Sequence, residues 1–195
     1  KKRRALKSRP SRDSIKDRVS IHDRPEEIND RSTFGHWEGD LILCQRTRPV
    51  LVLHERKTRM TFAARLTGKG AAETASVIMS IFKRLDPGLR QSITFDRGTE
   101  FSAWQRLKDG IGADAWFCDP QAPYQKGTVE NTNRRARRWL PRKRDITALT
   151  DHDMKMISDR LNNTPRKCLG WKTPAEVFRE KMMEEMGHAP YPQRQ

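Results

Sequence analysis

The sequence lacks any apolar run long enough to cross a membrane. Its longest purely aliphatic runs are residues 41–43 and 50–53, whereas a membrane-spanning helix needs about 18 or more apolar residues. The first residues also lack the apolar core of a secretory signal. These absences exclude a membrane-embedded protein and predict a cytoplasmic one.

Cysteine is scarce as well. The three cysteines, Cys44, Cys118 and Cys168, are odd in number and far apart, and neither they nor the five histidines show CxxC or HxxxH spacing. Isolated cysteines fit free thiols in a reducing compartment rather than a disulfide framework. The usual signature of a structural zinc site is also missing.

Negative charge is the third deficit. Lys and Arg number 40 against 25 Asp and Glu, which gives a net charge of +15. The excess is concentrated in residues 1–12 and 134–144, each with seven basic side chains and no acidic one. Such focused positive charge favours a polyanionic partner, above all nucleic acid, with an anionic membrane surface as the alternative.

The length of 195 residues suits one domain with tails. Residues 1–33 hold few apolar side chains and predict a basic flexible arm or linker. We expect a catalytic core over residues 34–145 and a C-terminal helical extension over 146–195.

Hydrophobic periodicity predicts strands alternating with helices. Strands are expected at residues 37–44, 50–55, 60–66, 93–96 and 114–118, and helices at 71–85, 102–109, 128–140, 151–161 and 173–186. This order predicts an α/β fold, a mixed five-stranded sheet with helices on both faces. Four tryptophans are expected in the core: Trp104, Trp116, Trp139 and Trp171.

Three carboxylates occupy positions that suit phosphoryl transfer. Asp40 lies on the first strand, Asp96 closes a later strand, and Glu130 stands in the first turn of the helix at 128–140. Such chemistry commonly uses two divalent ions held by carboxylates from different elements, and sites gather at the carboxyl ends of strands. Each acid alone is more often a turn former or a helix-end residue. Together, in a basic chain, they favour a metal site.

Neighbouring residues are candidates for supporting roles. Glu38 shares a strand face with Asp40, Asp119 follows the next strand, and His36 either supports the site or packs against the first strand. The candidates for DNA contact are Arg134, Arg135, Arg137, Arg138, Lys126, Tyr124 and Gln125. For Tyr124 and Gln125, packing is the alternative to contact with a splayed base.

Three sequence blocks carry a resemblance to a known family. They are residues 35–42 (GHWEGDLI), 94–100 (TFDRGTE) and 117–133 (FCDPQAPYQKGTVENTN), with 33 residues between Asp96 and Glu130. The blocks resemble the catalytic motifs of the IS-thirty family of bacterial insertion-sequence transposases, and the likeness extends over about residues 18–180. Arg137 matches that family's basic residue seven positions after its catalytic Glu.

The resemblance implies a ribonuclease H-like, retroviral-integrase-like fold and a DDE transposase catalytic domain. Asp40, Asp96 and Glu130 would bind two Mg²⁺ or Mn²⁺ ions, and the enzyme would cut the phosphodiester at element ends and join the freed 3′-hydroxyl to target DNA. It also implies a homodimer or larger assembly on DNA, at the bacterial nucleoid. The alternatives are a metal-dependent nuclease of the same fold and a catalytically idle DNA-binding module.

One departure from the family concerns recognition of the element ends. Family members usually begin with a helix-turn-helix domain, and nothing before residue 34 resembles one. The sequence leaves open whether that domain was trimmed or is naturally absent.

Overall fold

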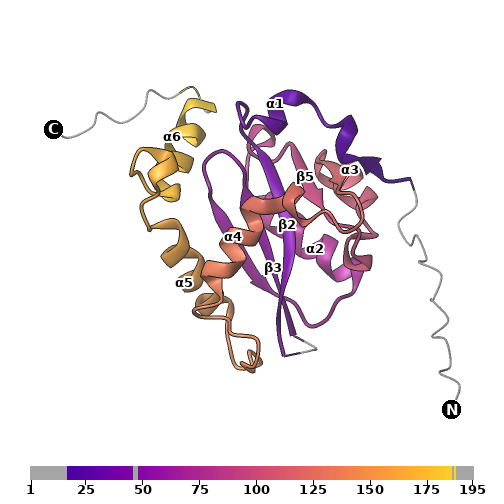
Figure 1. Ribbon diagram of the computed structural model, residues 1–195, viewed down its shortest axis with the longest axis vertical. Helices are drawn as coiled ribbons and strands as arrows, with labels where there is room; N and C mark the ends of the chain where they lie inside the picture. Colours follow the sequence, from indigo (N-terminus) through magenta and orange to yellow (C-terminus); the bar gives the residue numbers. More distant parts are fainter. Residues whose placement is uncertain (1–16, 46–47, 186, 188–195) are drawn as a thin grey trace, which may run out of the picture.

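A six-stranded mixed sheet forms the centre of the fold (Figure 1). The computed structural model describes residues 17–45, 48–185 and 187. The strand order is β1-β6-β5-β2-β3-β4, in which β2, β3 and β4 are antiparallel and β5, β6 and β1 continue parallel to β2. The strands are β1 (Val19–Ser20), β2 (His36–Cys44), β3 (Arg48–Glu55), β4 (Thr61–Arg65), β5 (Ser92–Phe95) and β6 (Asp114–Phe117). The five strands expected from the sequence are confirmed, and β1 is an addition.

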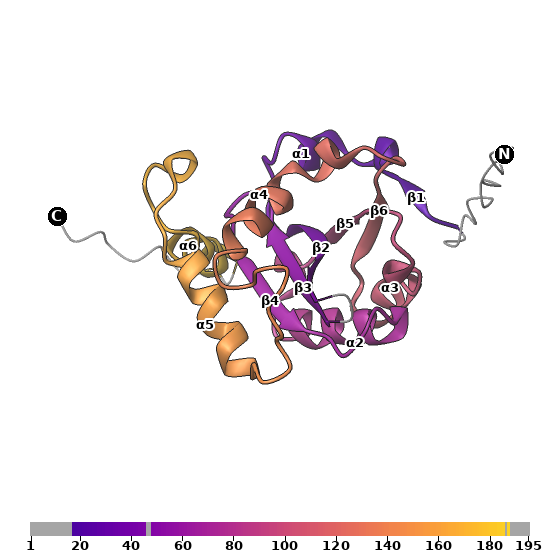
Figure 2. The same ribbon diagram turned by 60° about the horizontal axis from the view of Figure 1, so that its bottom comes forward.

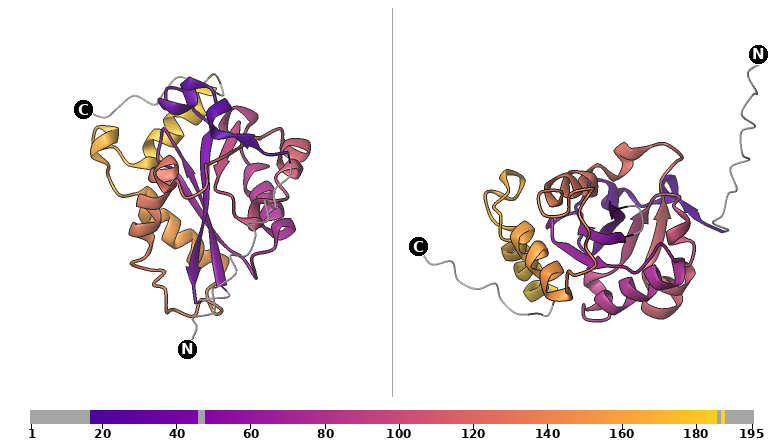
Figure 3. Two further views of the ribbon diagram at one scale, coloured as in Figure 1. Left: turned by 45° about the vertical axis from the view of Figure 1, so that its right-hand side comes forward. Right: turned by 90° about the horizontal axis from the view of Figure 1, so that it is seen from below.

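Helices cover both faces of this sheet (Figures 2 and 3). One face carries α2 (Ala71–Phe82) and α3 (Gln105–Ile111), and the other carries α4 (Gly127–Ala136) and α5 (Asp151–Asn162). Beside α5 lies α6 (Pro174–Glu185). The short helical turns are α1 (Glu26–Asn29), η1 (Ile21–Asp23), η2 (Pro87–Leu89), η3 (Thr99–Phe101), η4 (Pro123–Lys126) and η5 (Lys167–Leu169). The expected ribonuclease H-like arrangement is therefore present.

The alternation of side chains along β2 and β3 separates two cores. Leu51 and Leu53 of β3 pack with Trp37 in the core beneath α2 and α3. Val50 and Val52 pack in the second core with residues of α4 and α5. In β2 the same alternation turns Glu38 and Asp40 toward α4, where both side chains contact that helix.

The segment before residue 34 differs from the expectation of a flexible arm. Residues 17–33 form β1, η1 and α1, with Ile21 and Ile28 buried. Arg24 is 8% exposed, and its guanidinium donates hydrogen bonds to Thr94 and Asn29. A few apolar contacts and one buried arginine thus dock a segment whose composition alone predicts no structure. Residues 1–16, with the first basic run, lie outside the described residues.

Trp171 also differs from expectation. It is 69% exposed and has a φ of 69°, directly after Gly170, whose φ is 62°. Two successive residues in the left-handed region make a sharp turn before α6, which carries the indole away from the core. Trp104 is buried, whereas Trp116 and Trp139 are half-buried.

Cys44 and Cys118 are buried free thiols and Cys168 is an exposed one. Within residues 17–45 and 48–185, no helix is long and apolar enough to cross a membrane.

Gly39 of β2 gives a test of the close packing between β2 and Phe95 of β5. A Cβ added there would lie 2.5 Å from Cε1 of Phe95. We expect Gly39→Ala to lower the free energy of unfolding by about 1–3 kcal/mol in urea denaturation, because the core must shift to admit the methyl group. Gly68→Ala is the control, since no atom lies within 4 Å of its added Cβ. Equal stability of the two variants would refute the close packing of Gly39.

Candidate active site

Two carboxylates from adjacent strands converge on one cation. Asp40 Oδ1 of β2 lies 3.3 Å from Lys126 Nζ, and Asp96 Oδ2, just after β5, lies 3.0 Å from the same atom. Lys126 Nζ also donates to the backbone oxygen of Gly39 at 3.1 Å. The convergence follows from the sheet, because β2 and β5 are parallel neighbours.

Lys126 is a buried charge held by this pair. The residue is 4% exposed and ends η4, directly before α4. Burial alone lowers the pKa of Lys126, but Asp40 and Asp96 outweigh burial and raise it above its ordinary value. The lysine is therefore charged and neutralises part of the negative charge of the carboxylates.

The α4 helix presents a stripe of side chains to the acidic pair. Glu130, Asn133 and Arg137 follow one another at spacings of three and four residues, which places them on one helix face. Asn133 Nδ2 donates to Asp40 Oδ2 at 2.6 Å, and Arg137 Nη1 donates to the backbone oxygen of Leu43 at 2.8 Å. Arg137, seven residues after Glu130, therefore shares its helix face. Asn133 was not a candidate from sequence, and only its place in this stripe could have indicated it.

A cavity of about 260 Å³ joins the three acids. Its lining includes Asp40, Asp96, Lys126 and Glu130. Glu130 is exposed at this cavity, and in the described part of the chain no hydrogen bond or ion pair connects it to Asp40 or Asp96. Accordingly, among the described residues no three His, Cys, Asp or Glu side chains cluster closely enough to hold a metal ion.

The donor set nevertheless fits a hard divalent cation. Asp40 and Asp96 already direct oxygens at one cation position, which the Lys126 ammonium fills. Carboxylate oxygens are the ligands that Mg²⁺ prefers. A third ligand from Glu130 requires its side chain to turn toward the pair across the shared cavity.

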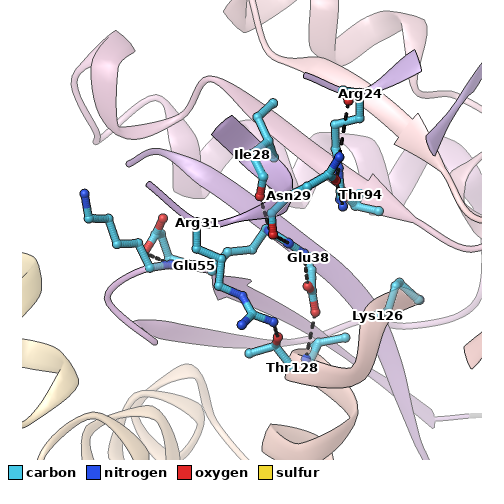
Figure 4. A network of polar contacts seen from close by, with 12 residues as sticks. Arg24, Ile28, Asn29, Arg31, Glu38, Glu55, Thr94, Lys126 and Thr128 are labelled. Atoms are coloured by element: carbon cyan, nitrogen blue, oxygen red, sulfur yellow. Dashed lines mark hydrogen bonds and ion pairs between the residues drawn. The ribbon is translucent and has the colours of Figure 1, made fainter. Parts of the chain in front are cut away.

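Glu38 connects this site to the rest of the fold (Figure 4). Its carboxylate is fully buried, pairs with Arg56 Nη1 and accepts the backbone N–H of Val129 at 2.9 Å. Arg56 in turn donates to the backbone oxygens of Ile28 and Asn29. Because Val129 directly precedes Glu130, Glu38 fixes the position of the first turn of α4.

Further contacts secure the N-terminal segment to α4 and β5. Arg31 Nη2 donates to Thr128 Oγ1 at 2.9 Å, and Arg24 Nη1 donates to Thr94 Oγ1 at 2.9 Å. Burial and the nearby Arg56 lower the pKa of Arg24 to about 10. Arg24, Arg31 and Arg56 were not singled out from the sequence, since a lone arginine carries no signal of its partner.

Asp119 lies in the same cavity as Asp96, in the loop before α4. Its Oδ2 is 2.7 Å from His22 Nε2 and accepts Gln125 Nε2 at 2.9 Å, while Gln125 Oε1 accepts the Asp119 N–H at 2.8 Å. The bonds from Gln125 and His22 lower the pKa of Asp119. Gln125 is thus engaged in shaping the loop.

His36 lies away from the acidic pair. It begins β2, four residues before Asp40, which corresponds to about 13 Å along the strand. Its Nδ1 is 2.8 Å from Ser92 Oγ, and it does not line the cavity of the three acids. Burial, then Arg56 and Arg24, lower the pKa of His36 to about 4, so the ring is neutral at pH 7.

The candidates for DNA contact occupy different environments. Tyr124, Gln125, Arg134 and Arg135 line an open cavity on the far side of α4 from the acids. Arg138 is exposed and lines neither cavity. As arranged here, the ammonium of Lys126 is bound by the acids and withdrawn from solvent.

Comparison with known proteins gives several related sequences. No protein-family model matches the chain. The transposase InsI for insertion sequence element IS30A of Escherichia coli (strain K12) is 39% identical over 158 residues, covering 81% of this chain and 41% of that protein. The transposase for insertion sequence element IS1086 of Cupriavidus metallidurans is 37% identical over 180 residues, covering 92% and 53%. The chain therefore spans about half the length of the relatives that it matches.

A solved structure shares the fold. The crystal structure of the catalytic core domain of BIV integrase superposes with a TM-score of 0.60 at 19% identity, over 78% of this chain and 98% of that one. The sheet and its helices thus form the expected integrase-like core.

The buried His36 predicts a dependence of stability on pH. The pKa of His36 is about 4 in the folded protein and 6.5 in its ordinary state. Between about pH 4 and pH 6.5, therefore, His36 is protonated in the unfolded chain and neutral in the folded protein. Stability contributed by neutral His36 is complete above about pH 6.5 and falls as the pH drops toward 4, by about 2 kcal/mol at pH 5. Urea denaturation at pH 7 and at pH 5 measures this loss of stability.

His36→Gln is the matched variant for this measurement. It keeps a polar partner for Ser92 and removes the titration, so the loss of stability between pH 7 and pH 5 should shrink by about 2 kcal/mol. An unchanged pH dependence would rule out a depressed pKa at His36. His54, which is also buried, is present in both proteins and does not affect the comparison.

Proposed function

The chain belongs to the family of the IS-thirty (IS30) transposases over the region that it shares with them, and on this premise we propose that it is the catalytic domain of a DNA transposase. The reaction would be hydrolysis of a phosphodiester at the ends of the element, followed by attack of the freed 3′-hydroxyl on target DNA. The observation that carries the proposal is the convergence of Asp40 and Asp96 on one cation position, with Glu130 at the same cavity.

DDE transposases and integrases generally use divalent metal ions, and we propose that Asp40, Asp96 and Glu130 hold two Mg²⁺ or Mn²⁺ ions here. Bound ions would activate the attacking oxygen and stabilise the leaving one. The residues of the chain prepare the ligands for this role. The Asn133 amide orients Asp40, and the Gly98 N–H, 2.9 Å from Asp96 Oδ1, orients Asp96.

The surroundings of the site support a DNA substrate. Seven basic residues lie between positions 134 and 144, and phosphate contacts position DNA without reading its sequence. We propose that element ends and target DNA are the partners, that the protein acts as a homodimer or larger assembly, and that it works at the bacterial nucleoid. Residues 34–145 would be the catalytic core and 146–195 its helical extension.

The test of this function is strand joining on a pre-nicked branched DNA with Mn²⁺ or Mg²⁺. We expect joining by the native chain, and its loss by about a thousandfold or more in Asp96→Asn and in Glu130→Gln, because each change removes a metal ligand. Asp109→Asn makes the same chemical change on the exposed side of α3 and should retain joining. A branched substrate supplies the DNA junction without a separate end-recognition domain.

The other outcomes of that assay distinguish the alternatives. Metal-dependent cleavage without joining would replace the proposal with a nuclease of the same fold. DNA binding with neither reaction in the native chain would replace it with an idle DNA-binding module.

Lys126 predicts a competition between its ammonium and a metal ion. Both would occupy the position between Asp40 and Asp96, so Lys126→Met should bind Mn²⁺ about tenfold more tightly than the native chain, as measured by electron paramagnetic resonance of free Mn²⁺. Methionine retains an unbranched apolar stem of similar length. The double variant Lys126→Met with Asp96→Asn should lose the gain, and weaker Mn²⁺ binding in Lys126→Met alone would refute the competition.

A further inference from the structure

A second, larger cavity lies on the opposite side of α4 from the three acids. Its volume is about 820 Å³. We call it the basic pocket and define it by six of its lining residues: Arg31, Arg59, Tyr124, Arg135, Arg166 and Lys167. They come from the N-terminal segment, the turn between β3 and β4, the loop before α4, α4 itself and the segment that follows α5.

The positive charge of the basic pocket is not balanced by the protein. Within the described ranges, none of its five cationic side chains forms an ion pair with a carboxylate. Glu38 is the one acid among the lining residues, and its oxygens already bind Arg56 and the Val129 N–H. Burial and the neighbouring cation Arg31 lower the pKa of Arg59 and outweigh the opposite effects of Cys168 and Glu38.

Two buried polar atoms at the basic pocket have no hydrogen-bond partner among the described residues. These are Nε2 of His54, a residue that is 3% exposed and also lines the cavity, and Nε of Arg59. Buried side-chain nitrogens of this kind are rarely left without a hydrogen-bond partner. Burial, then Arg59, Arg166 and Arg135, lower the pKa of His54 to about 3. Thr61 Oγ1 donates to a backbone oxygen, so Nδ1 of the neutral His54 ring donates to Thr61 and Nε2 is an acceptor. Arg59 Nε–H is a donor, and of the two atoms it is the one that favours a ligand with acceptor oxygens.

The surface of α4 connects the basic pocket to the active site. Thr128, Asn131 and Arg135 line the pocket, whereas Glu130 and Asn133 line cavities at Asp40. These two sets of residues lie on different faces of one helix. Arg134 lines both the basic pocket and the cavity beside Asp40, so positive charge continues from one to the other.

Tyr124 adds an aromatic surface to this charge. Its side chain is 78% exposed and lines the basic pocket directly before α4. An exposed ring beside cations is the arrangement by which proteins hold single-stranded nucleic acid, with phosphates on the cations and a base on the ring. A pocket of this size suits a ligand on the order of one or two nucleotides and is too small for a duplex.

We propose that the basic pocket binds the backbone phosphates of an unpaired stretch of the DNA strand that continues into the active site, with one base stacked on Tyr124. This inference rests on the proposed function for the identity of the strand as DNA. The scissile phosphate would lie at Glu130, on the active-site side of α4. The neighbouring unpaired nucleotides would pass around α4 and lie in the basic pocket on its other side.

Binding of a labelled single strand tests the basic pocket without catalysis. The probe is a 5′-fluorescein 12-nucleotide DNA, measured by anisotropy in EDTA over a series of salt concentrations. Arg135→Gln with Lys167→Gln removes two exposed cations that make no side-chain hydrogen bond in the described structure. Lys83→Gln with Arg84→Gln removes two exposed cations at the end of α2, on the other face of the sheet.

The pocket variant should bind the strand about tenfold more weakly than the native chain, and its slope of log affinity against log salt should fall by about 1.4. The α2 variant should remain within about twofold of native binding. Tyr124→Ala should weaken binding about five- to a hundredfold, whereas Tyr124→Phe, which keeps the ring, should not. Equal binding by the pocket and α2 variants would overturn the proposal.

Inorganic phosphate distinguishes a free anion from a strand. If phosphate displaces the labelled DNA as well as unlabelled strand does at equal phosphate concentration, the pocket is a simple anion site and the proposal is wrong. Weakened binding in the pocket variant with no strand joining in the native chain would reject the proposed function alone. Joining together with unaffected strand binding in the pocket variant would reject this inference alone.

Discussion

The buried pair of Glu38 and Arg56 is the constraint on which the arrangement of both cavities depends. The Glu38 carboxylate, on a central strand, accepts the Val129 N–H at the start of α4, and Arg56 extends the contact to the segment around α1. Burying two charges costs desolvation energy that their attraction barely offsets, so the main contribution of the pair is positional. It sets the rotation and height of α4 over β2, and thereby decides that Glu130 and Asn133 face Asp40 while Arg135 faces the basic pocket.

The Lys126 ammonium lies between Asp40 and Asp96 and serves as their counter-charge. Asp40 and Asp96 would repel each other if both were ionised without a counter-charge, and the buried ammonium removes this penalty. Lys126 lies four residues before Glu130 in the chain, so one short segment carries both the internal cation and the third proposed ligand. Under the proposed function, a metal ion would replace the Lys126 ammonium between Asp40 and Asp96, and Glu130 would turn toward them to supply the third ligand.

The sequence was sufficient for five of the six strands, for the main helices and for the positions of two acids on or after strands. The alternation of apolar and polar residues along β2 and β3 indicates which side chains share a face. In the structure β2 and β5 are parallel neighbours, which places Asp40 close to Asp96. Contacts between distant segments were not predictable, because single residues carry no signal of their partners. Arg56 binding Glu38, Asn133 binding Asp40 and the docking of β1 are of this kind. The basic run at 134–144 was visible, but the basic pocket also needs Arg31, Arg59 and Arg166, which are far apart in sequence.

The most direct measurement is a crystal structure of the chain with Mn²⁺, located by its anomalous scattering. If Asp40 and Asp96 form the metal site, manganese will lie about 2.2 Å from an oxygen of each, and the Lys126 ammonium will have left its position between them. Manganese bound elsewhere, or Lys126 still between the two carboxylates at saturating Mn²⁺, would show that these residues are not the metal centre of a transposase.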